Sequence, residues 1–389
     1  KLLLLLFVFF VAAAIVEAHG KYRLRTSHMG WGAEGRKINA MNLPRRLKEA
    51  RTRTQWTAFR AKHGKKYRNA SDEELHARIH EESEAIVEEH NAAFARGETS
   101  FKLAVNRFAD LTQEEYEKTM LMPLESAKFP KASKPTKRDL ESMMTLMGGS
   151  SRAERATGGI GNYSYSMNRK NCAGKVKDQG YCGSCYVFSA IGALEISECL
   201  LDEYLPMHTL SEQHALDCSS GGCHGGWMSD VYQYLQDNGG SILEKKYANY
   251  TAQQGQCNKN TCVGDRSPCI TIEKIYDMSN NETQMRRWMS FGGIAVAYNA
   301  NFYAHMLYHS GILDTDDCPQ VCCTHAVVIA GYGSENGKDY WLLRNSWGAD
   351  WGEGGYFKMA FGRNMCAFGR NAVYAKPRVE PERFPIPSQ

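Results

Sequence analysis

The sequence predicts an α+β protein preceded by a helical segment, because helix-forming and strand-forming patterns lie in separate parts of the chain. In residues 54–116, apolar side chains recur at helical spacing among Glu, Lys, Arg and Ala. One strong helix is expected at about 185–201, and short apolar runs typical of buried strands follow at 293–298, 325–330 and 340–344. Helix first and strands later favours α+β over the alternating units of a parallel sheet.

The N-terminal residues have the pattern of a signal peptide. Lys1 is followed by an unbroken apolar run from Leu2 to Val16, with a small residue at Ala18. The run of about 15 residues is shorter than the roughly 20 that a membrane-spanning helix needs, so a signal anchor is the less favoured interpretation. We therefore expect residues 1–18 to be removed, no membrane span, and a destination in a lysosome-like compartment or outside the cell. Four Asn-x-Ser/Thr sequons then become candidate glycosylation sites: Asn69, Asn162, Asn249 and Asn281.

Composition divides the rest of the chain. Residues 19–53 are strongly basic with little apolar periodicity, as is typical of a solvated extension. Residues 121–165 combine prolines, a basic run and glycines, as expected of an exposed linker that carries a processing site. The main body is expected at 166–376, and a Pro-rich tail at 377–389.

Charge is unevenly distributed along the chain, which has a net charge of +4. The basic excess belongs to residues 1–160, whereas residues 161–389 carry more acidic than basic side chains. A mildly acidic body suits an acidic compartment and gives no reason to expect nucleic acid as a partner.

One cysteine stands where a nucleophilic thiolate is expected. Thirteen cysteines cannot all pair within one chain, so at least one thiol is free. Cys185 opens the strong helix, and the dipole at a helix N-terminus stabilises a thiolate. Such a nucleophile needs a partner that exchanges protons and a third group that orients the partner. His325 and Asn345 are residues of the types required.

Other interpretations fit parts of this pattern. Cys182 and Cys185 form a Cys-x-x-Cys pair, as in thioredoxin-like redox proteins. A cysteine cluster can also bind zinc, although the chain has no pair of Cys-x-x-Cys units. His305 and His309 are four residues apart, but without a third ligand they are more typical of a surface pair than of a metal site.

The segments around these residues resemble the papain-like cysteine peptidases, and within them the cathepsin L-like subgroup. The segment Gln179-Gly-Tyr-Cys-Gly-Ser-Cys185-Tyr is similar to the motif around that family's catalytic cysteine. The blocks around His325 and Asn345-Ser-Trp-Gly follow it in the same order as in the family. The resemblance implies a two-lobed α+β fold, in which a helical lobe and a β-barrel-like lobe enclose the active-site cleft. It also implies a monomeric thiol peptidase that acts on proteins or peptides and needs neither a cofactor nor a metal.

The resemblance also implies a role for each site residue. Cys185 attacks the peptide carbonyl, His325 exchanges protons, and Asn345 orients the imidazole. Gln179 donates a hydrogen bond to the oxyanion, and Trp347 shields the His325–Asn345 contact. The pocket for the second residue before the scissile bond is expected near five residues: Trp227, Met228, Ala297, Cys323 and Asn371.

Residues 54–120 resemble the family's inhibitory propeptide. Trp56-x-x-Phe59 and Asn106-x-Phe108-x-Asp110 are similar to its motifs. Its interlocking helical motif matches outright only at the last of the positions Asp72, His76, His80, Ser83, Val87 and Asn91. The resemblance implies an inactive precursor whose own propeptide blocks the cleft until acid weakens acidic contacts such as those of Asp110. Cystatin-type inhibitors are the implied external partners.

Three disulfides follow from the resemblance: Cys182–Cys223, Cys218–Cys257 and Cys318–Cys366. The first would remove the redox dithiol. Six cysteines keep open pairings, with Cys262–Cys269 the local guess: Cys172, Cys199, Cys262, Cys269, Cys322 and Cys323.

Two questions about activity remain at this level. The short segment between Cys218 and Cys223 leaves no room for the histidine-containing loop of dipeptidases, which favours an endopeptidase. A catalytically silent relative that only binds other molecules is the main alternative. Such relatives typically lose the nucleophile, and Cys185 is present here.

Overall fold

The computed structural model describes most of the chain between Arg45 and Arg378. The described ranges are 45–123, 132–146, 165–166, 172–201, 207–258 and 269–378. The chain divides into two compact units, residues 1–57 and 58–389. Within the described ranges, no helix has both the length and the apolar character needed to cross a bilayer. The expected signal peptide and much of the expected linker and tail lie outside these ranges.

The first part of the described chain is helical, as the sequence predicts for residues 54–116, but its first helix begins earlier, at Arg45, inside the segment expected to be an extension. Its elements are α2 (Arg45–His63), α3 (Ala70–Ala95), the short strand β1 (Phe101–Leu103) and α4 (Gln113–Met120). The side chain of Asn69 caps α3 by accepting a hydrogen bond from the backbone of Asp72. A capping box formed by Thr112 and Glu115 begins α4.

Polar residues on α3 hold the turn that follows it. His76 Nδ1 lies 2.8 Å from the Asp110 carbonyl oxygen, and the Ser83 hydroxyl donates to the Ala109 carbonyl oxygen at 2.6 Å. The side-chain amide of Asn91 forms two hydrogen bonds with the backbone of Leu103: its Nδ2 donates to the carbonyl oxygen, and its Oδ1 accepts from the N–H. Most residues of the helical motif therefore differ from the family's, but side chains at the motif's positions still form hydrogen bonds to the backbone between Leu103 and Asp110.

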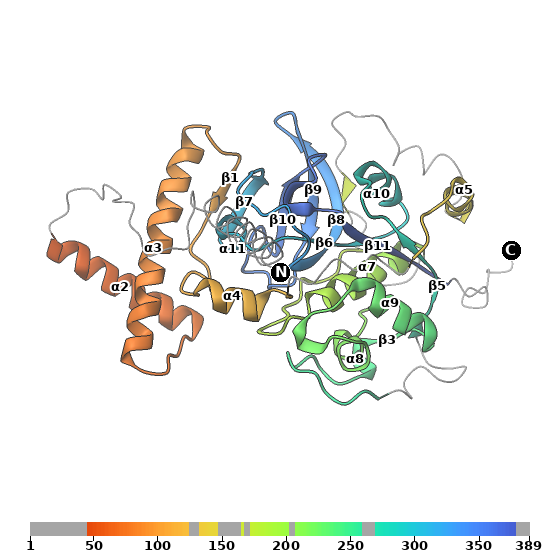
Figure 1. Cartoon of the computed structure of the whole chain (residues 1–389), viewed down its shortest axis with the longest axis horizontal. Helices are drawn as coiled ribbons and strands as arrows, with labels where there is room; N and C mark the ends of the chain where they lie inside the picture. The colour runs from red at the N-terminus through yellow and green to blue at the C-terminus, as the bar shows by residue number, and fades with distance from the viewer. Residues whose placement is uncertain are drawn as a thin grey trace, which may run out of the picture. The chain divides into compact units, whose positions relative to one another are not determined.

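The helices of the second part include one that is almost entirely buried. They are α5 (Lys137–Leu146), α7 (Cys185–Leu201), α8 (Glu212–Cys218), α9 (Met228–Asp237), α10 (Glu282–Trp288) and α11 (Tyr303–Met306). Nearly every residue of α7 is buried, because the helix packs between α9 and the strands β6 and β8. Figure 1 shows α7, α8 and α9 gathered together, with α3 beside the β1 edge of the sheet.

One large sheet forms the other side of the core. Its strand order is β1-β7-β10-β9-β8-β6-β11-β5, with β2 paired to β8. The bounds are β2 (Tyr165–Ser166), β5 (Ile272–Asp277), β6 (Ile294–Tyr298), β7 (Tyr308–Leu313), β8 (His325–Glu335), β9 (Lys338–Arg344), β10 (Tyr356–Ala360) and β11 (Asn371–Pro377). Strands β7 and β10 pair in parallel, and the other pairs are antiparallel. The small strands β3 (Ser241–Ile242) and β4 (Cys269–Ile270) form a separate pair.

The large sheet is open, so the expectation of a barrel-like lobe holds only in the looser sense of a curved sheet. The two ends of its strand order, β1 and β5, are not paired with each other. The strand β1, from the first part of the chain, pairs with β7 and thereby covers one edge of the sheet.

Disulfides fasten the loops around this core. Among the described residues the structure contains Cys172–Cys199, Cys182–Cys223, Cys218–Cys257, Cys318–Cys366 and Cys322–Cys323. Cys269 is also disulfide-bonded, and Cys262 lies outside the described residues. Cys185 is free.

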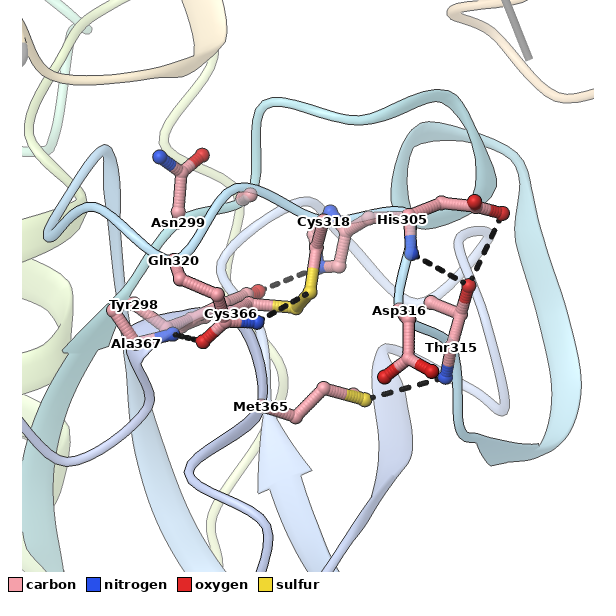
Figure 2. The surroundings of a disulfide bond; sticks show 12 residues. Tyr298, Asn299, His305, Thr315, Asp316, Cys318, Gln320, Met365, Cys366 and Ala367 are labelled. Atoms are coloured by element: carbon pink, nitrogen blue, oxygen red, sulfur yellow. Dashed lines mark hydrogen bonds between the residues drawn. A yellow bond between two sulfur atoms is a disulfide. The ribbon is translucent and has the colours of Figure 1, made fainter. Parts of the chain in front are cut away.

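The Cys318–Cys366 disulfide joins the loop before β8 to the segment before β11 (Figure 2). Beside it, the Gln320 side chain accepts a hydrogen bond from the Ala367 backbone at 3.3 Å. Met365 sulfur accepts another from the Thr315 backbone. These contacts hold the two loops together near the start of β8, whose first residue is His325.

Candidate active site

Cys185 occupies the first position of α7 and is fully buried. Gly183, two residues earlier, donates its backbone N–H to the Cys223 carbonyl oxygen at 3.0 Å, and an added Cβ there would lie 2.7 Å from that oxygen. Only glycine therefore lets the turn approach so closely. The helix that Cys185 begins packs against β8, the strand that His325 begins.

His325 begins β8 and is bonded to the side chain expected to orient it. Its Nε2 lies 2.8 Å from Asn345 Oδ1. Because an amide oxygen can only accept, Nε2 carries the ring proton when the imidazole is neutral. Nδ1 then keeps a free lone pair, and it has no hydrogen-bond partner within the described structure. The ring of Trp347 covers His325 at a centroid distance of 4.7 Å.

Gln179 presents its amide group to the same region. Its Oε1 accepts a hydrogen bond from the Ser346 hydroxyl at 2.6 Å, which fixes the orientation of the amide. Its Nε2 donates to the Cys182 carbonyl oxygen at 2.9 Å and to the Met120 carbonyl oxygen at 3.3 Å. A carbonyl oxygen of the propeptide therefore takes a donor that a substrate carbonyl could otherwise use.

The first part of the chain and the residues that follow it cover the site from several directions. Met122, two residues after the end of α4, donates its backbone N–H at 2.7 Å to the carbonyl oxygen of Thr324, the residue before His325. The rings of Phe108 and Tyr116 meet Trp347 edge-on at centroid distances of 5.2 and 5.9 Å. Both aromatic residues are fully buried, so this face of Trp347 is closed to solvent.

An ion pair also joins the first part of the chain to the second. Arg107 donates to both carboxylate oxygens of Asp178. Burial alone would raise the pKa of Asp178, but the hydrogen bonds and charge of Arg107 hold it below its ordinary value. Asp110, the acid singled out in the sequence, instead bonds within the propeptide, to Lys65 at 2.6 Å and to Tyr67 at 2.9 Å.

Enclosure under the propeptide favours neutral forms of the two reactive groups. Burial raises the pKa of the Cys185 thiol to about 12. Burial lowers the pKa of His325 to about 4, against the opposing effect of the Asn345 hydrogen bond. Near neutral pH the covered site therefore holds a thiol and a neutral imidazole in place of a thiolate–imidazolium pair.

The residues expected to line the substrate pocket are all buried. Ala297 of β6 lies opposite Asn371 of β11 in the sheet register. Met228 begins α9, directly after Trp227. Cys323 precedes the active-site strand and is bonded to Cys322. The structure thus brings Ala297 and Asn371 together, and places the other three at element ends.

Sequence reasoning missed a buried ionic cluster behind the site. Lys177 Nζ lies 2.6 Å from Glu212 and 3.1 Å from Glu195, and Arg344 Nη2 lies 3.7 Å from Glu195. Arg344 immediately precedes Asn345, so the cluster anchors the segment that orients His325. Nothing in the local sequence marks it, because its four members come from four separate segments of the chain.

The expectation for His305 is wrong. His305 is fully buried in α11, whereas His309 is exposed on β7, so the two do not form a surface pair. The rings of His305 and Trp347 are 5.1 Å apart at their centroids. Across the described ranges, no group of three or more His, Cys, Asp or Glu side chains is arranged to hold a metal ion.

Three of the four glycosylation candidates are exposed. Asn69 and Asn281 cap α3 and α10 through their side chains, and Asn249 lies in a loop. Asn162 lies outside the described residues.

Comparison with known proteins shows similarity over both parts of the chain. Residues 163–376 match the model of the papain family cysteine proteases, and residues 56–116 match the cathepsin propeptide inhibitor domain. Digestive cysteine proteinase 3 of Homarus americanus is 33% identical over 325 residues, covering 82% of this chain and 93% of that protein. Cathepsin L of Sarcophaga peregrina is 33% identical, covering 82% and 91% respectively.

Solved structures show the same likeness. Digestive procathepsin L2 from the Tenebrio molitor larval midgut matches with a TM-score of 0.71 and 30% identity, over 83% of this chain and 99% of that one. Digestive procathepsin L 3 from the same source matches with a TM-score of 0.68 and 30% identity, over 83% and 98%. Both matched structures are precursors that retain their propeptides, as this chain does.

Proposed function

Because the chain belongs to the papain family of cysteine proteases and carries that family's propeptide inhibitor domain, we propose that Cys185, His325 and Asn345 are its catalytic triad. The observation that carries the proposal is the His325–Asn345 hydrogen bond of 2.8 Å, together with a free, buried cysteine at the start of α7, the helix that packs on β8. That bond leaves Nδ1 of His325 as the nitrogen able to take a proton. Trp347 supports the pair by excluding water from it.

The proposed chemistry is acyl transfer in two steps. Nδ1 of His325 takes the proton of the Cys185 thiol, and the thiolate attacks the carbonyl carbon of the scissile bond. The imidazolium then gives that proton to the departing amine as the C–N bond breaks, which leaves a thioester on Cys185. A water molecule attacks the thioester while His325 accepts its proton. The carboxylic acid product leaves, and the thiol is restored.

Gln179 is proposed as the side-chain donor to the oxyanion of each tetrahedral intermediate. Its Oε1 is held by Ser346, and its Nε2 already bonds a carbonyl oxygen of the propeptide. Removal of one such donor from comparable sites costs about 2.7–4 kcal/mol of transition-state stabilisation.

We infer that the propeptide is an intramolecular inhibitor that prevents this chemistry in two ways. It fills the site with Met120, Tyr116 and Phe108, and it buries Cys185 and His325 so that both stay neutral. The processing site is proposed within residues 121–165, so that the mature enzyme is formed by 166–376. Secretion, with a lysosome-like or digestive extracellular destination, fits the names of the similar proteins. We also propose that the mature enzyme is a monomer and that cystatin-type inhibitors bind it.

The substrates are proposed to be proteins and peptides cut at internal bonds. Ala297, Asn371, Trp227, Met228 and Cys323 are mostly apolar, which favours a bulky hydrophobic residue two places before the scissile bond. Truncation of a substrate on that side should lower kcat as well as raise KM.

The direct test is to acidify the precursor, treat it with a thiol-directed epoxide and map the modified cysteine by mass spectrometry. We expect labelling at Cys185 alone, and no peptide hydrolysis by the Cys185→Ala chain. Cys185→Ala should retain its thermal unfolding transition, which serves as the folding control. Absence of labelling with an intact fold would favour a catalytically silent binding protein. Reversible oxidation of Cys182 with Cys185 would favour redox chemistry.

A further inference from the structure

A second histidine lies behind the proposed catalytic one. His305 is fully buried, and its ring meets His325 edge-on at a centroid distance of 6.1 Å. It also contacts Trp347 and Trp351 at 5.1 and 5.2 Å. The proposed mechanism gives this imidazole no task, although it lies against the wall of the site.

Two phenolic hydroxyl groups contact the ring nitrogens of His305. The Tyr298 hydroxyl lies 2.5 Å from Nε2, and the Tyr116 hydroxyl lies 3.4 Å from Nδ1. The Tyr116 hydroxyl also donates to the Ala300 carbonyl oxygen at 3.1 Å. Tyr298 and Tyr116 are both fully buried, so every proton in this group must find a partner inside the protein.

One proton arrangement satisfies the whole group. Burial, reinforced by the nearby His325, lowers the pKa of His305, so its ring is neutral and carries one proton. If Tyr298 donates to Nε2, then Nδ1 carries that proton and donates it to Tyr116, which in turn donates to Ala300. In the opposite tautomer Nε2 carries the ring proton, so both Nε2 and the Tyr298 hydroxyl would be donors in the single contact between them. It would also require the Tyr116 proton to serve both Nδ1 and Ala300.

Tyr116 belongs to the propeptide and leaves with it. Its departure removes the partner of the N–H at Nδ1 of His305 and of the Ala300 carbonyl oxygen, which leaves one donor and one acceptor for an incoming hydroxyl group. Trp347, which Tyr116 meets edge-on at 5.9 Å, forms the apolar side of the same place. The precursor therefore shows a tyrosine side chain already seated at this position.

The position lies close to the proposed proton donor. Trp347, which Tyr116 meets edge-on, packs on His325 at 4.7 Å, and His325 must reach the leaving nitrogen to donate its proton. We therefore assign the position to the part of a substrate that follows the scissile bond.

We propose that His305 and Ala300 form a hydroxyl-binding subsite that selects tyrosine on the departing side of peptide substrates. The inference rests on the proposed peptidase activity. Tyr298 is its positioning residue, because its hydroxyl fixes the tautomer of His305. A phenylalanine in the same place would leave the His305 donor buried without a partner.

The test compares matched peptides that differ only in Tyr or Phe at the first, second or third residue after the cut. The enzyme is the full chain after acid activation. At one of these positions we expect kcat/KM to be about tenfold higher for Tyr than for Phe. A ratio near one at all three positions would overturn the subsite, and this part needs no variant protein.

Variants assign the preference to His305. In His305→Phe the Tyr-to-Phe ratio should fall to about one, whereas damage to packing alone would lower both peptides together and leave the ratio unchanged. His305→Asn, which can restore a donor near the Nδ1 position, should recover part of the ratio. Tyr298→Phe should lower the Tyr-to-Phe ratio, because His305 Nε2 would lose its hydrogen-bond donor and the ring proton could then occupy either nitrogen. An unchanged tenfold ratio in His305→Phe would show that the hydroxyl is recognised elsewhere.

The outcome separates the two proposals. An enzyme that cleaves both peptides equally retains the proposed function and loses the subsite. An enzyme that cleaves neither peptide nor an unstructured protein substrate loses the proposed function, and the subsite with it.

Discussion

Acid should loosen the covered site through His325 itself. Burial lowers the pKa of this imidazole to about 4 in the precursor, and exposure to solvent would return it to its ordinary value of about 6.5. The open state then binds a proton more tightly than the covered state. The stability of the covered state is therefore lost as pH falls below about 6.5, and the loss levels off below about 4.

The size of this effect follows from the same two values. Proton linkage gives a loss of about 2 kcal/mol at pH 5 and about 3 kcal/mol at pH 4. A change of about 3 kcal/mol makes opening roughly a hundredfold more favourable. It is comparable to the energy of several ordinary hydrogen bonds, so this one residue would account for a substantial part of acid activation.

The assay uses the Cys185→Ala chain, which cannot process itself under the proposed mechanism. Hydrogen exchange of the amides in α4 (Gln113–Met120), corrected for the intrinsic rate at each pH, measures the free energy of opening. The matched control carries His325→Gln as well, because glutamine does not titrate. Other groups, including the propeptide histidines, are the same in both chains and cancel in the difference.

The expected result is that opening of the Cys185→Ala chain becomes easier by about 3 kcal/mol more than opening of the double variant between pH 7 and pH 4. Equal changes in the two chains would refute the reasoning, because His325 would then contribute nothing to the pH response.

Three further predictions concern single side chains. Gln179→Ala should lower kcat of the activated enzyme by about 10²–10³-fold in steady-state peptide hydrolysis, and an unaltered kcat would remove Gln179 from the oxyanion site. Arg107→Ala deletes the partner of Asp178, so conversion of the precursor at neutral pH, followed on gels, should be faster than in the unaltered chain; the same rate would show that this ion pair does not hold the propeptide. Burial against Phe59 lowers the pKa of His80, so its neutral form stabilises the propeptide only above the ordinary pKa of histidine; His80→Phe should shift processing to lower pH, and an unshifted or higher midpoint would contradict this.

The sequence determines the family and the order of its parts because those features are local. The helix that begins at Cys185, the strand that begins at His325 and the block around Asn345 each carry a short motif that contains one of the candidate site residues. The same locality explains why a helical propeptide could be predicted although most of its interlocking motif has changed. Helix formation needs only apolar spacing and caps, and Asn69 supplies the cap.

The tertiary structure decided which distant side chains meet. His305 looked like half of a surface pair, since spacing along the chain does not reveal that its ring is buried against Trp347 and Trp351. The contact of its Nδ1 with Tyr116 joins residues far apart in sequence. The neutral forms favoured at Cys185 and His325 likewise arise from enclosure by another segment. The sequence by itself thus determined which reactive groups this protein has, and only the fold decided their surroundings, because burial and partnership depend on packing between segments that no local pattern encodes.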